Sequence, residues 1–112
     1  MNNDEYTLAI DDVIDIKAKF TLRSKGVDKV FAPTLTINRI DPSDAELNNE
    51  KSIKEFMLDN TTAWKDQRLV LDRDGNPADF TRAALEKFFQ APGVCILFWN
   101  TYIKEIAAKE KN

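Results

Sequence analysis

Apolar and polar residues alternate over two stretches near the start of the chain, from Val13 to Arg23 and from Val30 to Arg39. A period of two is typical of strands that bury one face. A glycine-containing turn, Ser24–Asp28, separates the stretches, so we predict an antiparallel β-hairpin over residues 13–40. Pro33 lacks an amide hydrogen, which predicts a sheet edge or a bulge at that position. The positions expected to face the core are Ile14, Ile16, Ala18, Phe20 and Leu22 in the first strand and Phe31, Leu35 and Ile37 in the second.

The rest of the chain, residues 43–112, is predicted to be mainly helical. Ser43 with Glu46 and Ser52 with Glu55 have the spacing of a capping box. They favour a short turn followed by a helix from Ser52 to about Asn60, and a single broken helix is the alternative. The core-facing positions of the helix from Ser52 to about Asn60 are Ile53, Phe56 and Met57.

A short strand and a reversal are predicted after Trp64. The run at residues 67–72 is rich in leucine and β-branched residues, and would extend the hairpin to a small meander. The residues of Asp74–Pro77 each favour turns, so the chain is expected to reverse there.

The next helix is bounded by capping residues. Thr81 has the position of an N-cap, with Phe80 and Leu85 placed to contact each other across the first turn. The helix is expected to end at Gln90 or Ala91, because proline and then glycine follow.

The last predicted helix runs from Val94 to about Lys109 and carries two apolar stripes. One explanation is that the sheet covers one side and the Thr81 helix the other. The alternative is a partner-binding or self-association surface centred on Trp99 and Tyr102, residue types enriched at binding hot spots. The stripes are Cys95, Phe98 and Tyr102, and Ile96, Trp99, Ile103 and Ile106.

These elements predict an α+β fold with an N-terminal antiparallel β-hairpin or small meander and three to four helices packed on one side. At 112 residues, the chain is expected to form a single domain, residues 1–112. The longest apolar run, Val94–Trp99, is too short for a membrane span, and the N-terminus lacks the basic start of a secretory signal. We therefore expect a cytoplasmic protein without a membrane partner.

Composition and charge argue against several classes of function. The chain contains no histidine, which removes the usual proton carrier, the common nucleophile pairs and most zinc sites, so we predict no enzymatic activity and no cofactor. The net charge of −3 disfavours duplex nucleic acid as a partner. Cys95 is expected to be a small buried side chain and not a nucleophile.

Two local patterns resemble ligand sites. Asp72, Asp74 and Asn76 alternate like the start of a calcium loop, but Pro77 and Ala83 stand where that loop needs glycine and glutamate, so a tight turn is predicted. The hairpin is rich in basic residues and could imitate a single-strand nucleic-acid platform. Strand alternation, however, places its phenylalanines opposite the cations. The basic residues are Lys17, Lys19, Arg23, Lys25, Lys29 and Arg39.

The order of residues in the C-terminal half resembles the small phage and prophage tail assembly chaperone families. In those families a similar run follows an N-terminal β-rich segment. The matching positions are Trp64, Val70, Asp72, Gly75, Pro77, Phe80, Thr81, Leu85, Pro92, Gly93, Val94 and Tyr102.

The resemblance implies a non-catalytic protein in the bacterial host cytoplasm that coats a tape-measure protein, or another tail protein, until the tail tube forms. Such a protein needs an accessible apolar groove for amphipathic helices. We expect the groove between the last helix and the sheet, and the candidate partner-binding residues are Phe98, Trp99, Tyr102, Ile103 and Ile106. A minor structural tail component that forms homo-oligomers, and a single-strand nucleic-acid-binding module, are the alternatives.

Overall fold

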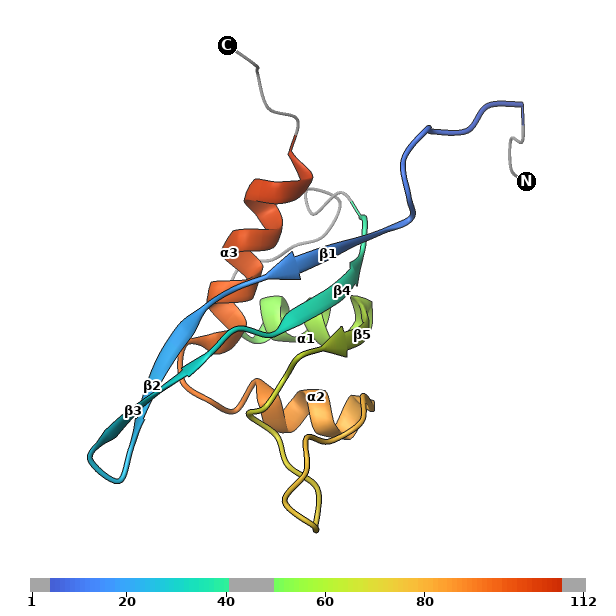
Figure 1. The fold of residues 1–112 in the computed structure, drawn as a ribbon. Helices are drawn as coiled ribbons and strands as arrows, with labels where there is room; N and C mark the ends of the chain where they lie inside the picture. Colours follow the sequence, from blue (N-terminus) through green and yellow to red (C-terminus); the bar gives the residue numbers. More distant parts are fainter. Residues whose placement is uncertain (1–4, 41–49, 108–112) are drawn as a thin grey trace.

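The computed structural model describes residues 5–40 and 50–107, and the predicted turn at Ser43 lies outside this part of the chain. The described elements form an α+β fold in which four antiparallel strands come first and three helices follow, with a fifth strand between the first two helices (Figure 1). This agrees with the predicted fold class.

The predicted hairpin is confirmed as a long ribbon of four short strands. β1 (Val13–Lys17) pairs with β4 (Thr34–Asn38), and β2 (Phe20–Ser24) pairs with β3 (Val27–Phe31). Lys25 and Gly26 close the ribbon with φ values of 54° and 78°. A two-residue turn with two positive φ angles matches the twist of the strands it joins.

Pro33 lies where the ribbon is interrupted. The backbone N–H of Ala18 donates to the Pro33 carbonyl over 3.3 Å, but proline has no N–H to donate in return, so the second hydrogen bond of the pair cannot form. The ribbon is therefore divided into a two-stranded part, β2–β3, and a part that belongs to a larger sheet.

The third strand of that sheet is β5 (Thr61–Lys65), which gives the order β1-β4-β5. The prediction of a strand near residues 67–72 was wrong, because Asp66 has a left-handed φ of 60° and the chain leaves the sheet there. Two threonines and a tryptophan make residues 61–65 good strand formers, and Trp64 lies opposite the buried Leu35 of β4.

Residues 67–78 form a tight hairpin loop instead of a strand. Asp72 and Asn76 are joined by a backbone hydrogen bond of 2.8 Å, and the Asp72 carboxylate also accepts the amides of Asp74 and Asn76. Gly75 has a φ of 83°, which glycine adopts without strain. The predicted reversal at Asp74–Pro77 is therefore confirmed.

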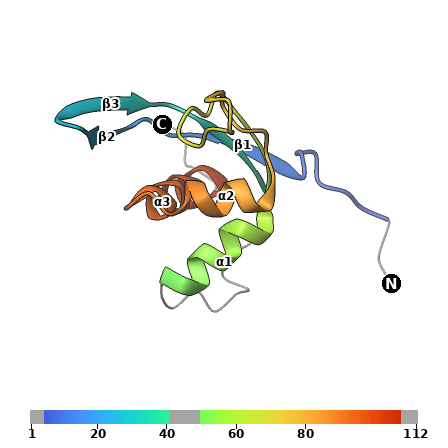
Figure 2. The ribbon, with the colours of Figure 1, turned by 90° about the horizontal axis from the view of Figure 1, so that it is seen from below.

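All three helices cover one face of the sheet (Figure 2). They are α1 (Glu50–Asn60), α2 (Arg82–Phe88) and α3 (Val94–Ile106). The Thr81 hydroxyl caps α2 by accepting the Ala84 amide over 3.0 Å, as predicted. The α2 helix ends two to three residues earlier than expected, because Gln90 and Ala91 make tighter hydrogen bonds to the residues three positions before them.

The last helix begins after Gly93, whose φ of 81° turns the chain as the sequence predicted. The described helix ends at Ile106 and Ala107 is extended, while the predicted end at Lys109 lies outside the described residues. The α3 helix packs against α1 and β1, and α2 reaches it through the Phe88 and Phe98 rings, 5.8 Å apart.

The core joins the inner face of the sheet to all three helices. Its predicted members Ile16, Leu35 and Ile37 from the strands, and Met57 from α1, have almost no exposed surface. A row of aromatic rings links the far ends of the fold, each within 5.3–6.4 Å of the next. The rings are those of Phe31, Phe20, Phe98, Phe88, Trp64 and Phe80.

Candidate functional site

The structure divides the five predicted partner-binding residues of α3 into two groups. Phe98 and Tyr102 are 0% exposed and belong to the core, so a partner cannot touch them in this conformation. Trp99, Ile103 and Ile106 are half-buried and lie on one helical face at spacings of four and three residues. We call these three residues the α3 stripe.

Tyr102 anchors the α3 helix to the end of β4. Its hydroxyl accepts the Ile40 amide over 3.0 Å and lies 2.7 Å from the Asn38 carbonyl, to which it can donate. Burial raises the pKa of the phenol above its ordinary value, with the Ile40 hydrogen bond acting against that rise. The prediction that Tyr102 centres a binding surface is therefore replaced by a structural role.

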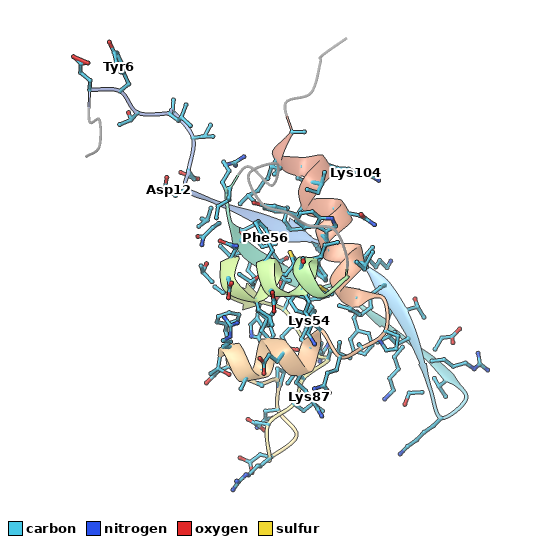
Figure 3. The ribbon with its side chains drawn as sticks, turned by 180° about the vertical axis from the view of Figure 1, so that it is seen from behind. Tyr6, Asp12, Lys54, Phe56, Lys87 and Lys104 are labelled. Carbon is cyan, nitrogen blue, oxygen red and sulfur yellow. The ribbon has the colours of Figure 1, made fainter. Side chains whose placement is uncertain are left out.

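Trp99 of the α3 stripe packs against two aromatic rings, those of Phe56 and Tyr102. The Trp99 ring lies edge-on to Phe56 of α1, with centroids 5.4 Å apart, and 6.1 Å from the Tyr102 ring. Phe56 lies on α1, which packs against α3 (Figure 3), and it is itself buried. Ring contacts of this kind hold an indole in one orientation, so the stripe presents a preformed apolar edge.

Lys19 and Arg23 alternate with Phe20 and Leu22 and so lie on the other face of the ribbon, as predicted, but Lys29 was predicted wrongly, because it is paired with Leu22 and shares a face with Phe31. Phe20 stacks on Phe31 at 5.6 Å and meets the core residue Phe98 edge-on. The stacked pair is thus half-buried and oriented towards the helices. Single-strand platforms need rings that are open to bases, and this pair has its neighbours in the protein.

The two most exposed large apolar side chains of the described residues lie near the N-terminus. Residues 5–12, here called the N-terminal arm, leave the body in an extended path in Figures 1 and 3. Tyr6 and Leu8 are 79% and 80% exposed, and Ile10 is 53% exposed. Their alternation along the sequence allows a short strand, which Asp11 and Asp12 should interrupt, and the structure has no strand in this segment.

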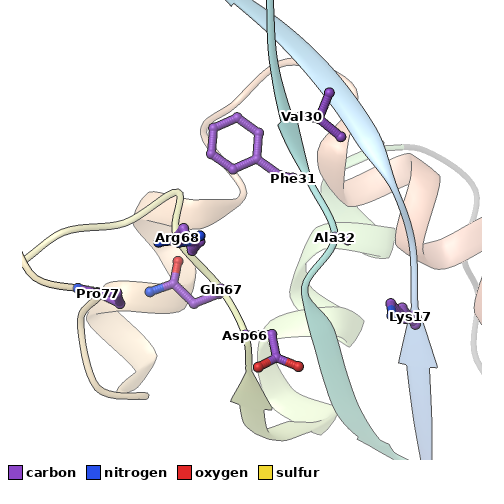
Figure 4. Close-up of a pocket in the computed structure, with 8 residues that line it drawn as sticks. All are labelled: Lys17, Val30, Phe31, Ala32, Asp66, Gln67, Arg68 and Pro77. Carbon is purple, nitrogen blue, oxygen red and sulfur yellow. The ribbon is translucent and has the colours of Figure 1, made fainter.

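A groove of about 640 Å³ opens where β5 turns away from the ribbon (Figure 4). One wall is the segment Val30–Ala32, and the other is Asp66–Arg68 with Pro77; Lys17 lies at the end of β1. Val30 is 59% exposed, although Phe31 beside it packs on Phe20. The groove therefore combines apolar side chains with two cations and one carboxylate.

The described residues contain no cluster of three or more histidine, cysteine, aspartate or glutamate side chains that could hold a metal ion. The calcium-like run is a turn whose Asp72 carboxylate is occupied by two backbone amides. Within the described ranges, no helix is both long and apolar enough to cross a membrane.

Polar side chains link the strands on the outer face of the sheet. The Thr36 hydroxyl donates to the Asp15 carboxylate over 2.6 Å, and Lys65 Nζ lies 3.5 Å from the same carboxylate. The Thr36 hydrogen bond is the main reason that the pKa of Asp15 is lowered; partial burial acts against it, and the Lys65 charge adds to it. These contacts connect β1, β4 and β5.

Replacing Thr36 by valine should raise the pKa of Asp15 towards its ordinary value and make the protein less stable at neutral pH. A lowered folded-state pKa adds stability above the unfolded value of about 3.9, and that contribution is lost as the pH falls through the folded value. The difference in stability between wild type and variant should therefore shrink as the pH falls from about 3.9 through the lowered pKa of Asp15. NMR titration of the Asp15 carboxyl and denaturant unfolding at several pH values measure both effects.

Thr21→Val is the matched control, because Thr21 is an exposed strand residue on the β2–β3 part of the ribbon. It should leave the pKa of Asp15 unchanged. A Thr36→Val variant with the wild-type Asp15 pKa would contradict the role of this hydrogen bond.

A scan against protein-family models and searches of curated proteins and of solved structures found no match to the chain.

Proposed function

We propose that the protein is a non-catalytic tail assembly chaperone of a phage or prophage, which binds the amphipathic helices of a tape-measure-type partner. The observation that carries the proposal is the α3 stripe. It is a preformed apolar edge, partly open to solvent, with the i, i+4, i+7 spacing that suits packing against another helix.

The segment that resembles the chaperone families supports this proposal through its structural role. Trp64 packs on Phe80 at 5.3 Å and on Phe88 at 5.6 Å, and its indole N–H donates to the Ala78 carbonyl. Leu85 is fully buried, and Gly93 starts the helix that carries the stripe. The motif residues thus build one scaffold that positions α3.

Co-expression with a tape-measure protein encoded beside this gene tests the proposal. The chain should raise the soluble yield of the partner, and Ile103→Asp with Ile106→Asp should abolish that gain, because two charges would replace apolar surface at the contact. Equal partner solubility with and without the chain would refute the chaperone function.

Lys104→Asp is the matched control for the charge change. Lys104 is exposed and lies next to Ile103 on the same helix, outside the stripe. The control should keep the full gain in partner solubility. Thermal unfolding of each purified variant shows whether a loss arises from the contact surface or from the fold.

A minor structural tail component that self-assembles is the second candidate, and the exposed apolar residues of the N-terminal arm favour it. A chaperone should be missing from finished particles, whereas a structural component should remain in them. Mass analysis of purified particles distinguishes the two candidates.

A further inference from the structure

The N-terminal arm has the pattern of a strand without a sheet. Tyr6, Leu8 and Ile10 would all project from one face of an extended chain, and their exposed surface is unusual for side chains of this size. The arm is also acidic, since residues 5–12 contain Glu5, Asp11 and Asp12 but no lysine or arginine. The N-terminal arm is therefore expected to bind a sheet edge that is apolar and positively charged.

An unpaired sheet edge exists along β3. Within the described chain β3 pairs with β2 alone, so every second residue directs its backbone N–H and C=O to an unpaired side. That side is the one on which β5 lies beside β4, because β3 and β4 follow each other along one edge of the ribbon. The left-handed Asp66 turns the chain away, and the place next to β3 is left as the groove of about 640 Å³.

Charge and apolar surface in the groove complement the arm. Lys17 and Arg68 line the groove, with Asp66 as the one acidic lining residue. Val30, Phe31 and Pro77 supply apolar contacts for alternate side chains of an incoming strand.

We propose that the N-terminal arm of one copy of this chain binds along β3 of a second copy and adds a strand to its two-stranded ribbon. The arm cannot readily serve its own groove. It joins the start of β1, where Val13 pairs with Asn38, whereas the groove lies beside the opposite edge of the ribbon, so the arm would have to reverse direction and cross both strands to reach it. The contact joins two different surfaces, so it extends into a ring or an open series of copies. This proposal stands independently of the chaperone function.

Sedimentation velocity of the full chain tests the contact. The wild type should form larger species as its concentration rises. An arm variant, Leu8→Asn with Ile10→Asn, and a groove variant, Val30→Asp with Arg68→Glu, should each associate at least about tenfold more weakly, a change of about 1.4 kcal/mol. Wild type that stays monomeric into the millimolar range would overturn the proposal.

Mixing the two variants gives the sharpest result. The arm variant keeps an intact groove and the groove variant keeps an intact arm, so an equimolar mixture should form a dimer of one copy of each. Neither variant alone should do so. A mixture that remains monomeric although both variants are folded would overturn the proposal, as would self-association of either variant at the wild-type level.

Matched controls separate this contact from general surface effects. Thr7→Asn with Ala9→Asn places the same residues at the interleaved positions of the arm, and Lys104→Glu reverses an exposed charge on α3. Both should associate like the wild type. If the Val30 change impairs folding, Arg68→Glu alone serves as the groove variant, because Arg68 is exposed. Association by this route with no effect on tape-measure solubility would reject only the chaperone function.

Discussion

Replacing Phe98 by alanine should lower the free energy of unfolding by about 3–5 kcal/mol, the usual cost of removing a large aromatic side chain from a core. Phe98 has no exposed surface, and its ring lies 5.8 Å from Phe88 and 6.4 Å from Phe20. The alanine variant would open a cavity at the junction of α2, α3 and the ribbon. Denaturant unfolding followed by circular dichroism measures the loss.

Phe98→Leu is the matched control, since leucine fills much of the same space. It should cost less than the alanine variant by roughly 2 kcal/mol or more, because most of the cavity is removed. A loss below about 1 kcal/mol for Phe98→Ala would contradict the assignment of this ring to the core and return it to the candidate binding surface.

The second large effect is expected at Gln67, the only polar residue of the described hairpin loop, residues 67–78, that is buried. Its side-chain NH₂ donates to the carbonyls of Val70 and Ala78 at 2.8 and 3.2 Å, and its carbonyl accepts the amides of Leu69 and Val70. Gln67→Leu keeps a similar size but leaves these backbone groups without their partner. We expect a loss of about 2–4 kcal/mol in the free energy of unfolding.

Hydrogen exchange shows whether the loss arises in the loop. The amides of Leu69 and Val70 should exchange faster in Gln67→Leu than in wild type, because they no longer donate to the side chain. Gln90→Leu, at an exposed glutamine after α2, should change the free energy of unfolding by less than about 0.5 kcal/mol. Equal effects of the two substitutions would show that the Gln67 hydrogen bonds contribute nothing specific.

The two expected effects bear on function through the position of the α3 stripe. Phe98 and Tyr102 fix one side of the helix to the sheet, and this leaves Trp99, Ile103 and Ile106 towards the other side. The buried residues therefore determine which side chains of α3 remain for the proposed partner. Substitutions at the stripe should affect partner binding more than folding, and those at Phe98 should do the reverse.

Structural features that depend on residues close together in the chain could be predicted from the sequence. The alternation in residues 13–40 predicted the paired strands and their buried face, and the glycine turn predicted where they reverse. Thr81 marked a helix start because its side chain caps an amide three residues further on, and Gly93 marked another because its positive φ suits glycine.

Features that depend on distant residues needed the folded chain. Residues 61–65 form the third strand because Trp64 pairs with Leu35 of β4. Residues 67–72 form part of a loop because the Gln67 side chain hydrogen-bonds to the backbone of Val70. The burial of Phe98 and Tyr102 follows from contacts such as that of Tyr102 with Ile40, sixty-two positions away. Periodicity reports that a face is apolar, but which apolar face is covered depends on the packing of elements from separate parts of the chain.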